Sequence, residues 1–215
     1  MKKQLTVLLL LSTSWTIFAQ TETPTTEKES NKFEIAVIPK LGFGKVQETG
    51  SPATNGFFNG GDLIFSIRPG KQKIWKFSTG IGYLEFWGNK NMEGTSADLK
   101  NAYLHIPVNA SADVILYKNT KPQNQNVLLN VGLGLYANDQ IKEEVETISG
   151  TFSDSNLGWN FGFTTQLGLK FELSDLLDFG FGYEVQADLS EAKKGGIERK
   201  IQNANTINFT MAFKL

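Results

Sequence analysis

The sequence has 215 residues, with no cysteine, one histidine and a formal net charge of -1. A chain without cysteine can hold neither a disulfide framework nor a cysteine-based metal site. The near-neutral charge also argues against a nucleic-acid partner, because surfaces that bind nucleic acid are basic. Composition alone therefore determines neither the fold nor the function, and the order of the residues is more informative.

Residues 1–19 have the three parts of a secretory signal peptide. Lys2 and Lys3 precede the apolar run LTVLLLLSTSW, and the small residue Ala19 provides a cleavage point. A membrane-spanning helix is the competing interpretation, but the run is shorter than the roughly 20 residues that such a helix needs. Residues 20–32, QTETPTTEKESNK, have no apolar pattern and are expected to form a flexible polar leader. We therefore expect an exported protein whose folded domain covers residues 33–215.

Alternation of apolar and polar residues dominates this domain. In LGWNFGFTTQLGLKF, residues 157–171, the alternate positions from Trp159 onward are mostly large and apolar, and the residues between them are polar or glycine. A period of two indicates a β-strand with one apolar face. The same pattern predicts eight strands, at 33–46, 57–69, 73–87, 101–116, 126–137, 157–172, 176–189 and 204–215.

The connections between these strands alternate in length. Those at 47–56, 88–100, 138–156 and 190–203 are long and polar, whereas 70–72 and 173–175 are tight and 117–125 is intermediate. Long outer loops and short periplasmic turns are typical of outer-membrane barrels. We therefore predict an all-β fold, an eight-stranded antiparallel up-and-down transmembrane β-barrel with both chain ends in the periplasm. The alternatives are a secreted β-sandwich and a soluble lipocalin-like barrel, which would need an apolar interior.

The two faces of the predicted strands differ in chemistry. The apolar face is expected to contact the lipid of a bacterial outer membrane, so outer-membrane lipid is an expected partner. The opposite face carries charges and repeated glycines, which would weaken a soluble sheet but relieve crowding inside a narrow barrel. The inward charges are expected to be Glu34, Lys40, Asp62, Arg68, Lys76, Asp113, Lys170, Glu172, Glu184, Asp188 and Lys214.

A family resemblance rests on the stretch NAYLHIPVNASADVIL at 101–116, on the N-terminal segment ending in FAQ and on the glycine-rich strands. Together they resemble the small outer-membrane β-barrel proteins of the PorT-like family, a Bacteroidetes type. The most specific part is Tyr103 to Val108, YLHIPV, which is similar to the Y-L-x-I-P signature of that family. The end of the chain, NFTMAFKL, departs from the usual aromatic terminal residue, because Phe213 lies two residues inside. The resemblance implies an eight-stranded barrel, and the secretion role of the founding member is not transferred.

Candidate catalytic residues are few. His105 shares its parity with Tyr103 and Asp113, which places it inside the barrel, whereas barrel enzymes that modify lipid A use residues at the lipid-facing rim. The DFG string at 178–180 lies in a predicted strand without the other kinase motifs. The glycine-rich strands lack the helix of a dinucleotide loop. We expect no catalytic residue, no cofactor and no metal ligand, with calcium binding by the acidic segment 138–156 left open.

Four inward charges are predicted to form two ion pairs in the lumen, Glu34 with Arg68 and Lys40 with Asp62. A symmetric loop at 47–56 would place the members of each pair directly opposite each other, with Gly42 opposite Gly60. Unpaired charges in a confined lumen would be costly. An eight-stranded barrel is also just wide enough to be filled by side chains, so we expect a plugged lumen rather than a diffusion pore.

The functional expectation is a non-enzymatic outer-membrane barrel that presents its extracellular loops for binding or has a structural role in the envelope. Two alternatives remain, an accessory component of a protein secretion system and a lipid-modifying barrel enzyme. The sequence identifies no protein partner on either side of the membrane.

Overall fold

The computed structural model describes residues 32–69, 74–92, 95–118 and 126–215. The predicted signal peptide, nearly all of the predicted leader, the predicted turn at 70–72 and most of that at 117–125 lie outside the described residues. Among the described residues, no helix is long and apolar enough to cross a membrane.

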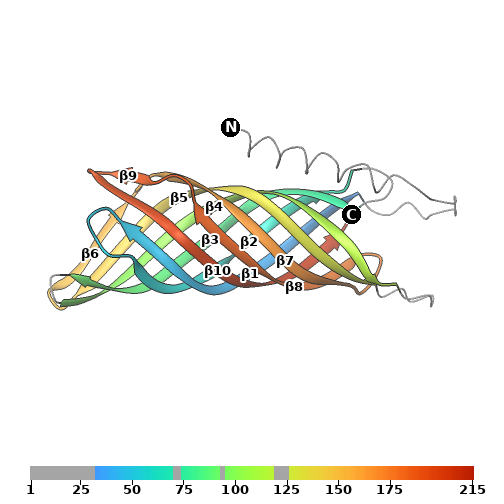
Figure 1. The fold of residues 1–215 in the computed structure, drawn as a ribbon, viewed down its shortest axis with the longest axis horizontal. Coiled ribbons are helices and arrows are strands. Elements are labelled where there is room, and N and C mark those ends of the chain that lie inside the picture. Colours follow the sequence, from blue (N-terminus) through green and yellow to red (C-terminus); the bar gives the residue numbers. More distant parts are fainter. Residues whose placement is uncertain (1–31, 70–73, 93–94, 119–125) are drawn as a thin grey trace, which may run out of the picture. The chain divides into compact units, whose positions relative to one another are not determined.

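The described residues form ten antiparallel β-strands (Figure 1). Eight of them make a closed ring in which each strand pairs with the next ring strand in the chain, and β1 closes the ring by pairing with β10. The predicted eight-stranded antiparallel up-and-down barrel is therefore confirmed. The ring strands are β1 (Phe33–Glu48), β2 (Thr54–Ile67), β3 (Trp75–Met92), β4 (Thr95–Tyr117), β5 (Val127–Thr147), β7 (Trp159–Glu172), β8 (Leu177–Asp188) and β10 (Ile197–Lys214).

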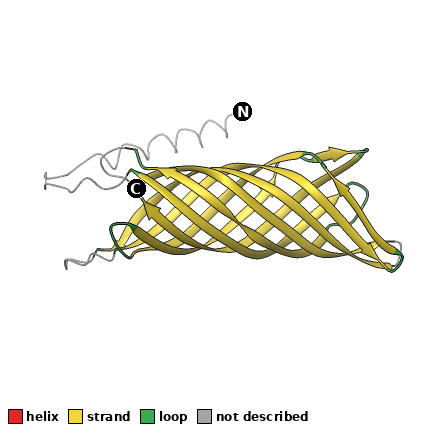
Figure 2. Cartoon of the chain, turned by 180° about the vertical axis from the view of Figure 1, so that it is seen from behind, coloured by secondary structure: helices red, strands yellow, loops and turns green. Residues whose placement is uncertain are grey.

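Two short strands lie outside the ring, β6 (Gly150–Ser155) on β5 and β9 (Ala192–Lys194) on β10. The turn between β9 and β10 is Gly195–Gly196, and both glycines have positive φ, 61° and 80°. Two such residues fit a two-residue hairpin turn whose twist matches the strands it joins. The segments predicted as long loops at 88–100, 138–156 and 190–203 are therefore mostly strand, and those loop predictions were wrong. Figure 2 shows loops confined to the two ends of the barrel.

The barrel has two different ends. Phe33 and Leu215 lie at one end, here called the terminal end, and the backbone of Leu215 donates to the carbonyl of Phe33 across 2.9 Å. The other end, here called the hairpin end, carries the extensions of β3, β4 and β5 together with β6 and β9 (Figure 1).

The outer surface of the ring is apolar over much of its length. Exposed and buried positions alternate along β1 and along β7, as a barrel with one outer and one inner face requires. Aromatic side chains lie on the outer face toward both ends, and Trp75, Trp87 and Trp159 are each about half exposed. A soluble protein could not leave so much apolar surface in water, whereas a lipid bilayer requires it.

Two β-bulges near the hairpin end reverse the alternation. One lies where the β1–β10 register shifts between Lys45 and Val46, and the other where the β4–β5 register shifts between Ala102 and Tyr103. A bulge adds one residue to one strand and turns the following side chains to the other face. As a result Glu143 and Arg199 are buried, although a continued alternation would place both outside.

The predicted register between the first two strands was wrong by two residues. Glu34 lies opposite Ser66 and Lys40 lies opposite Gly60. The error arises because β2 begins at Thr54 rather than at residue 57, so the connection is centred nearer to β1 than expected. Thr54, Asn55 and Gly56 carry no apolar signal, yet their backbone continues the ladder.

Candidate functional site in the barrel lumen

The lumen consists of layers of side chains stacked along the barrel axis, and β1 contributes a residue to each of them. From the terminal end, its buried inward residues include Glu34, then Lys40, then Val46, and the half-buried Glu48 follows. The lumen therefore has two charged layers, an apolar layer and a charged cap at the hairpin end. Each layer is completed by residues from other strands of the ring.

The layer nearest the terminal end is a network of acids and bases centred on Glu34. The carboxylate of Glu34 accepts from Arg68, Lys76 and Lys170 at 3.1, 3.2 and 3.1 Å. Arg68 also reaches Asp113 at 2.5 Å, and Lys170 reaches Asp178 at 2.7 Å. Because most of these charges have more than one opposite neighbour, the network spans the barrel rather than joining only adjacent strands.

The second charged layer is a triad of buried side chains on three strands. Lys40 Nζ lies 2.7 Å from Asp62 Oδ2 and 2.6 Å from Glu184 Oε1. Gln186 donates to the same Glu184 oxygen at 2.6 Å. A Cβ atom at Gly82 would lie 1.9 Å from Asp62 Oδ1, so this glycine leaves the space that the carboxylate occupies.

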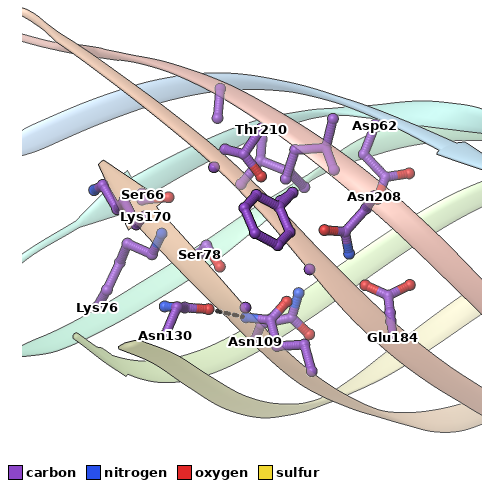
Figure 3. Close-up of a pocket in the computed structure, with 18 of the residues that line it drawn as sticks. Asp62, Ser66, Lys76, Ser78, Asn109, Asn130, Lys170, Glu184, Asn208 and Thr210 are labelled. Carbon is purple, nitrogen blue, oxygen red and sulfur yellow. Dashed lines mark hydrogen bonds between the residues drawn. The ribbon is translucent and has the colours of Figure 1, made fainter. Parts of the chain in front are cut away.

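A small polar cavity of about 60 Å³ separates the two charged layers (Figure 3). Its walls include Ser66 and Ser78 on one side and Asn208 and Thr210 on another. A volume of this size has room for a few water molecules. The cavity therefore lies within the lumen, between the two charged layers.

His105 lies beyond the triad toward the hairpin end and is fully buried. Its Nδ1 atom is 2.7 Å from Asn138 Oδ1, and its ring packs at 5.3 Å from the ring of Tyr136. The hydroxyl of Tyr136 donates to Asp188 at 2.6 Å, and Asn160 and the backbone N–H of Ile201 donate to the same carboxylate. Asp188 therefore links β5, β7 and β10 by hydrogen bonds to three donors.

An apolar layer follows, in a part of the lumen where side chains from opposite sides of the ring meet. Phe58 and Phe86 pack with ring centroids 5.0 Å apart, and neither is more than 1 % exposed. Buried apolar side chains in contact exclude water and give this layer the character of a soluble protein core. Its members are Val46, Phe58, Leu84, Phe86, Leu99, Tyr103, Ile201 and Ala204.

A charged cap covers the apolar layer at the hairpin end. Arg199 donates from Nε and Nη2 to the two oxygens of Glu143, at 2.9 and 3.0 Å, in a bidentate pair that joins β10 to β5. Lys90 forms an ion pair with Glu48, which also lies 3.8 Å from Arg199. Burial raises the pKa of the Glu143 carboxyl above its ordinary value, and the hydrogen bonds from Arg199 act against that shift without cancelling it.

The structure brings the members of both predicted charge pairs into contact. Glu34 meets Arg68 at 3.1 Å and Lys40 meets Asp62 at 2.7 Å. Because of the register, both contacts run diagonally between strands rather than directly across. Each pair is also part of a larger group, since Lys40 is shared with Glu184.

Sequence reasoning missed several charged residues of the lumen, among them Asp178, Glu143 and Arg199. Asp178 is 1 % exposed and forms ion pairs with Lys170 and Lys214. It lies an even number of residues before Glu184, which was predicted to face inward on the same strand, so the alternation could have placed it in the lumen. The inward positions of Glu143 and Arg199 could not be predicted in this way, because the alternation of apolar and polar residues does not indicate where the two bulges lie. Among the predicted inward charges, Glu172 is only partly buried and lies 3.9 Å from Lys214.

The acidic segment 138–156 does not gather its carboxylates at one point. Glu143 faces inward to Arg199, Glu144 pairs with Lys142 at 2.6 Å and Asp154 pairs with Lys194 at 2.7 Å. Within the described part of the chain, no group of three or more potential metal ligands is present. The DFG string at 178–180 lies in β8, where its aspartate joins the lumen network and Phe179 faces outward.

Comparison with known proteins identifies the class of the barrel. No protein-family model and no curated protein matches the sequence. Among solved structures, Neisserial surface protein A shares 14 % identity over 85 % of this chain and 97 % of that chain, with a TM-score of 0.52. Ail, the attachment invasion locus protein of Yersinia pestis, matches at 13 % identity over 85 % and 99 % of the two chains, with a TM-score of 0.37. The translocator domain of the autotransporter NalP from Neisseria meningitidis matches at 11 % over 99 % and 94 %, with a TM-score of 0.37.

The likeness to Neisserial surface protein A shows a shared fold. A closed antiparallel ring with an apolar outer band and a polar interior defines the class of integral outer-membrane β-barrel proteins. The bacterial outer membrane is accordingly the location of this protein.

Proposed function

We propose that this protein is a sealed, non-enzymatic outer-membrane barrel that presents a β-sheet to the cell exterior as a binding surface. In such barrels the longer connections face outward and the short turns face the periplasm. The hairpin end is then extracellular and the terminal end periplasmic. The seal and the presented sheet are the two parts of the proposal.

The seal is supported by the stacking of four layers across one narrow lumen. An eight-stranded ring leaves an interior about as wide as its side chains. The apolar layer around Phe58 and Phe86 lies between the charged layers and the cap formed by Glu143 and Arg199. An ion that crossed would have to enter this apolar layer without its hydration, which is strongly unfavourable.

The binding surface is supported by the strands that continue past the apolar band. β4 and β5 remain paired as far as Asp98 and Glu146, and β6 adds a third strand to this sheet. All six residues of β6 are exposed, and the adjoining turn carries Ile148 at 92 % exposure. An exposed strand edge with apolar side chains is a feature that binds other chains.

The seal can be tested by measuring conductance across planar bilayers that contain the purified full-length protein. The wild-type protein should give no steady current steps. A combined Phe58→Ala, Phe86→Ala, Arg199→Ala variant should conduct, because it removes both phenylalanine rings of the apolar layer and the arginine of the cap. Phe161→Ala, on the outer face of β7, is the control and should remain silent. Steady channels in the wild-type protein would refute the seal.

The non-enzymatic part of the proposal is supported by the position of the single histidine. His105 is fully buried in the lumen, beside Asn138 and Tyr136, where the acyl chains of a membrane lipid do not reach. A relationship to the PorT-like family is also proposed, on the strength of the YLHIPV stretch, whose Tyr103 belongs to the apolar layer. Deletion of the gene, followed by analysis of secreted proteins and of envelope integrity, would separate a secretion role from a structural one.

A further inference from the structure

The outer face of β10, β1 and β2 changes character near the hairpin end. Below this point it is apolar, with Val37, Leu41 and Ile207 about half exposed on the outer face. Above it, the outward positions of the three strands are mainly amides and one lysine. These residues, here called the amide patch, are Lys45, Asn55, Asn59, Asn203 and Asn205, grouped around Phe43.

The ladder registers place the members of the amide patch side by side. Lys45 lies opposite Asn203 on one side and opposite Asn55 on the other. One step toward the apolar band, Phe43 lies between Asn205 and Phe57. Phe43 is 66 % exposed, and the patch therefore surrounds an open aromatic ring with hydrogen-bonding groups.

The amide patch is continuous with the apolar outer band of the barrel, and the orientation given under the proposed function, on which this inference rests, places it at the outer leaflet. The exposed apolar residues below it contact the acyl chains of the outer leaflet, so whatever lies directly above those chains contacts the patch. Lipid headgroups occupy that depth of a bilayer. The side of the barrel formed by β7 differs, because its outward residues near the same end are Phe161 and Trp159.

We propose that the amide patch binds the phosphorylated saccharide headgroup of an outer-leaflet glycolipid. An asparagine amide offers two donors and one acceptor oxygen, which matches the hydroxyl groups of a sugar. The ring of Phe43 offers a flat apolar surface for the C–H face of the sugar, and the Lys45 ammonium offers a positive charge to a phosphate. Tyr183 donates to Asn205 Oδ1 at 2.9 Å, which holds that amide in place with its nitrogen available to the headgroup.

The proposal is tested by native mass spectrometry of the full-length protein in detergent, with purified lipopolysaccharide and phosphatidylglycerol offered at equal concentration. The wild-type protein should carry the glycolipid in preference to the phospholipid. A combined Lys45→Ala, Asn203→Ala, Asn205→Ala variant should lose about tenfold in glycolipid occupancy. A heat-dependent shift in gel migration shows whether each variant is folded.

The control is a combined Lys142→Ala, Phe161→Ala variant, whose two positions lie outside the amide patch. It removes one lysine and one exposed aromatic ring from other parts of the outer face, on β5 and β7. Its glycolipid occupancy should equal that of the wild-type protein. Equal binding of the two lipids by the wild-type protein, unchanged glycolipid binding by the folded patch variant, or an equal loss in the control would each overturn the proposal.

Discussion

Replacement of Lys40 by alanine is expected to destabilise the barrel strongly, because it leaves two carboxylates without their shared cation. Lys40, Asp62 and Glu184 are 2 %, 4 % and 3 % exposed, so water cannot replace the lost ammonium efficiently. The variant would place two like charges in one confined layer of the lumen. No other base is found within ion-pair distance of Asp62 or Glu184 in the described residues.

The expected magnitude follows from the two distances, 2.7 and 2.6 Å. At an effective dielectric constant of about 20, each pair contributes on the order of 6 kcal/mol of attraction, most of which offsets desolvation. Removal of one partner from a buried pair typically costs about 3 to 5 kcal/mol. We therefore expect Lys40→Ala to lower the free energy of unfolding by about 3 to 5 kcal/mol.

A neutral variant of the whole triad separates this electrostatic cost from simple loss of contacts. The combination Lys40→Met, Asp62→Asn, Glu184→Gln removes all three charges together and should be more stable than Lys40→Ala. Lys142→Ala is the control, since its pair with Glu144 is exposed and should contribute about 0 to 1 kcal/mol. Urea unfolding in lipid vesicles, followed by tryptophan fluorescence, measures all four proteins. A triple variant less stable than Lys40→Ala would refute the reasoning.

Further outcomes follow from the other layers. Gly42→Ala should cost about 1 to 3 kcal/mol in the same unfolding assay, because its Cβ would lie 2.0 Å from the backbone oxygen of Asn205. Burial raises the pKa of Glu143, so the folded state retains a proton that the unfolded chain releases, and stability should fall as the pH rises above the ordinary carboxyl range. Glu143→Gln should flatten that slope in unfolding curves taken at several pH values. His105→Ala should leave the lipid A acylation pattern unchanged in mass spectra, and an altered pattern would restore the enzyme hypothesis.

Sequence reasoning succeeded where lipid imposes a strict alternation. In the membrane band most outward positions are apolar, and side chains alternate between the two faces of a strand. The outward positions of Val37 and Phe163 therefore show that Lys40 and Thr164 face inward. This argument identified the strands of the ring and placed Glu34, Lys40, Asp62 and His105 inside.

The same reasoning failed where lipid no longer acts on the outer face. Beyond the band, β5 continues to Thr147 with polar residues on both faces, and no apolar signal distinguishes this strand from a loop. The bulges at this level then reverse the parity, so the positions of Glu143 and Arg199 depend on backbone geometry that the pattern does not encode. The error in the β1–β2 register has the same cause, because β2 begins at Thr54, beyond the apolar band, where no apolar residue marks the strand.

Polarity inverts along the axis of the barrel, and β1 shows the change within a few residues. Leu41 and Phe43 face outward as apolar residues above the inward Lys40, whereas Lys45 faces outward as a polar residue next to the inward Val46. At the depth of the lipid the apolar surface lies outside, so the interior can be polar, and it is held together by ion pairs. Past the lipid the outer face meets water, and the hydrophobic effect can act only by filling the interior. The apolar layer therefore lies at the hairpin end, where it provides both a core for the extended strands and the barrier of the proposed seal.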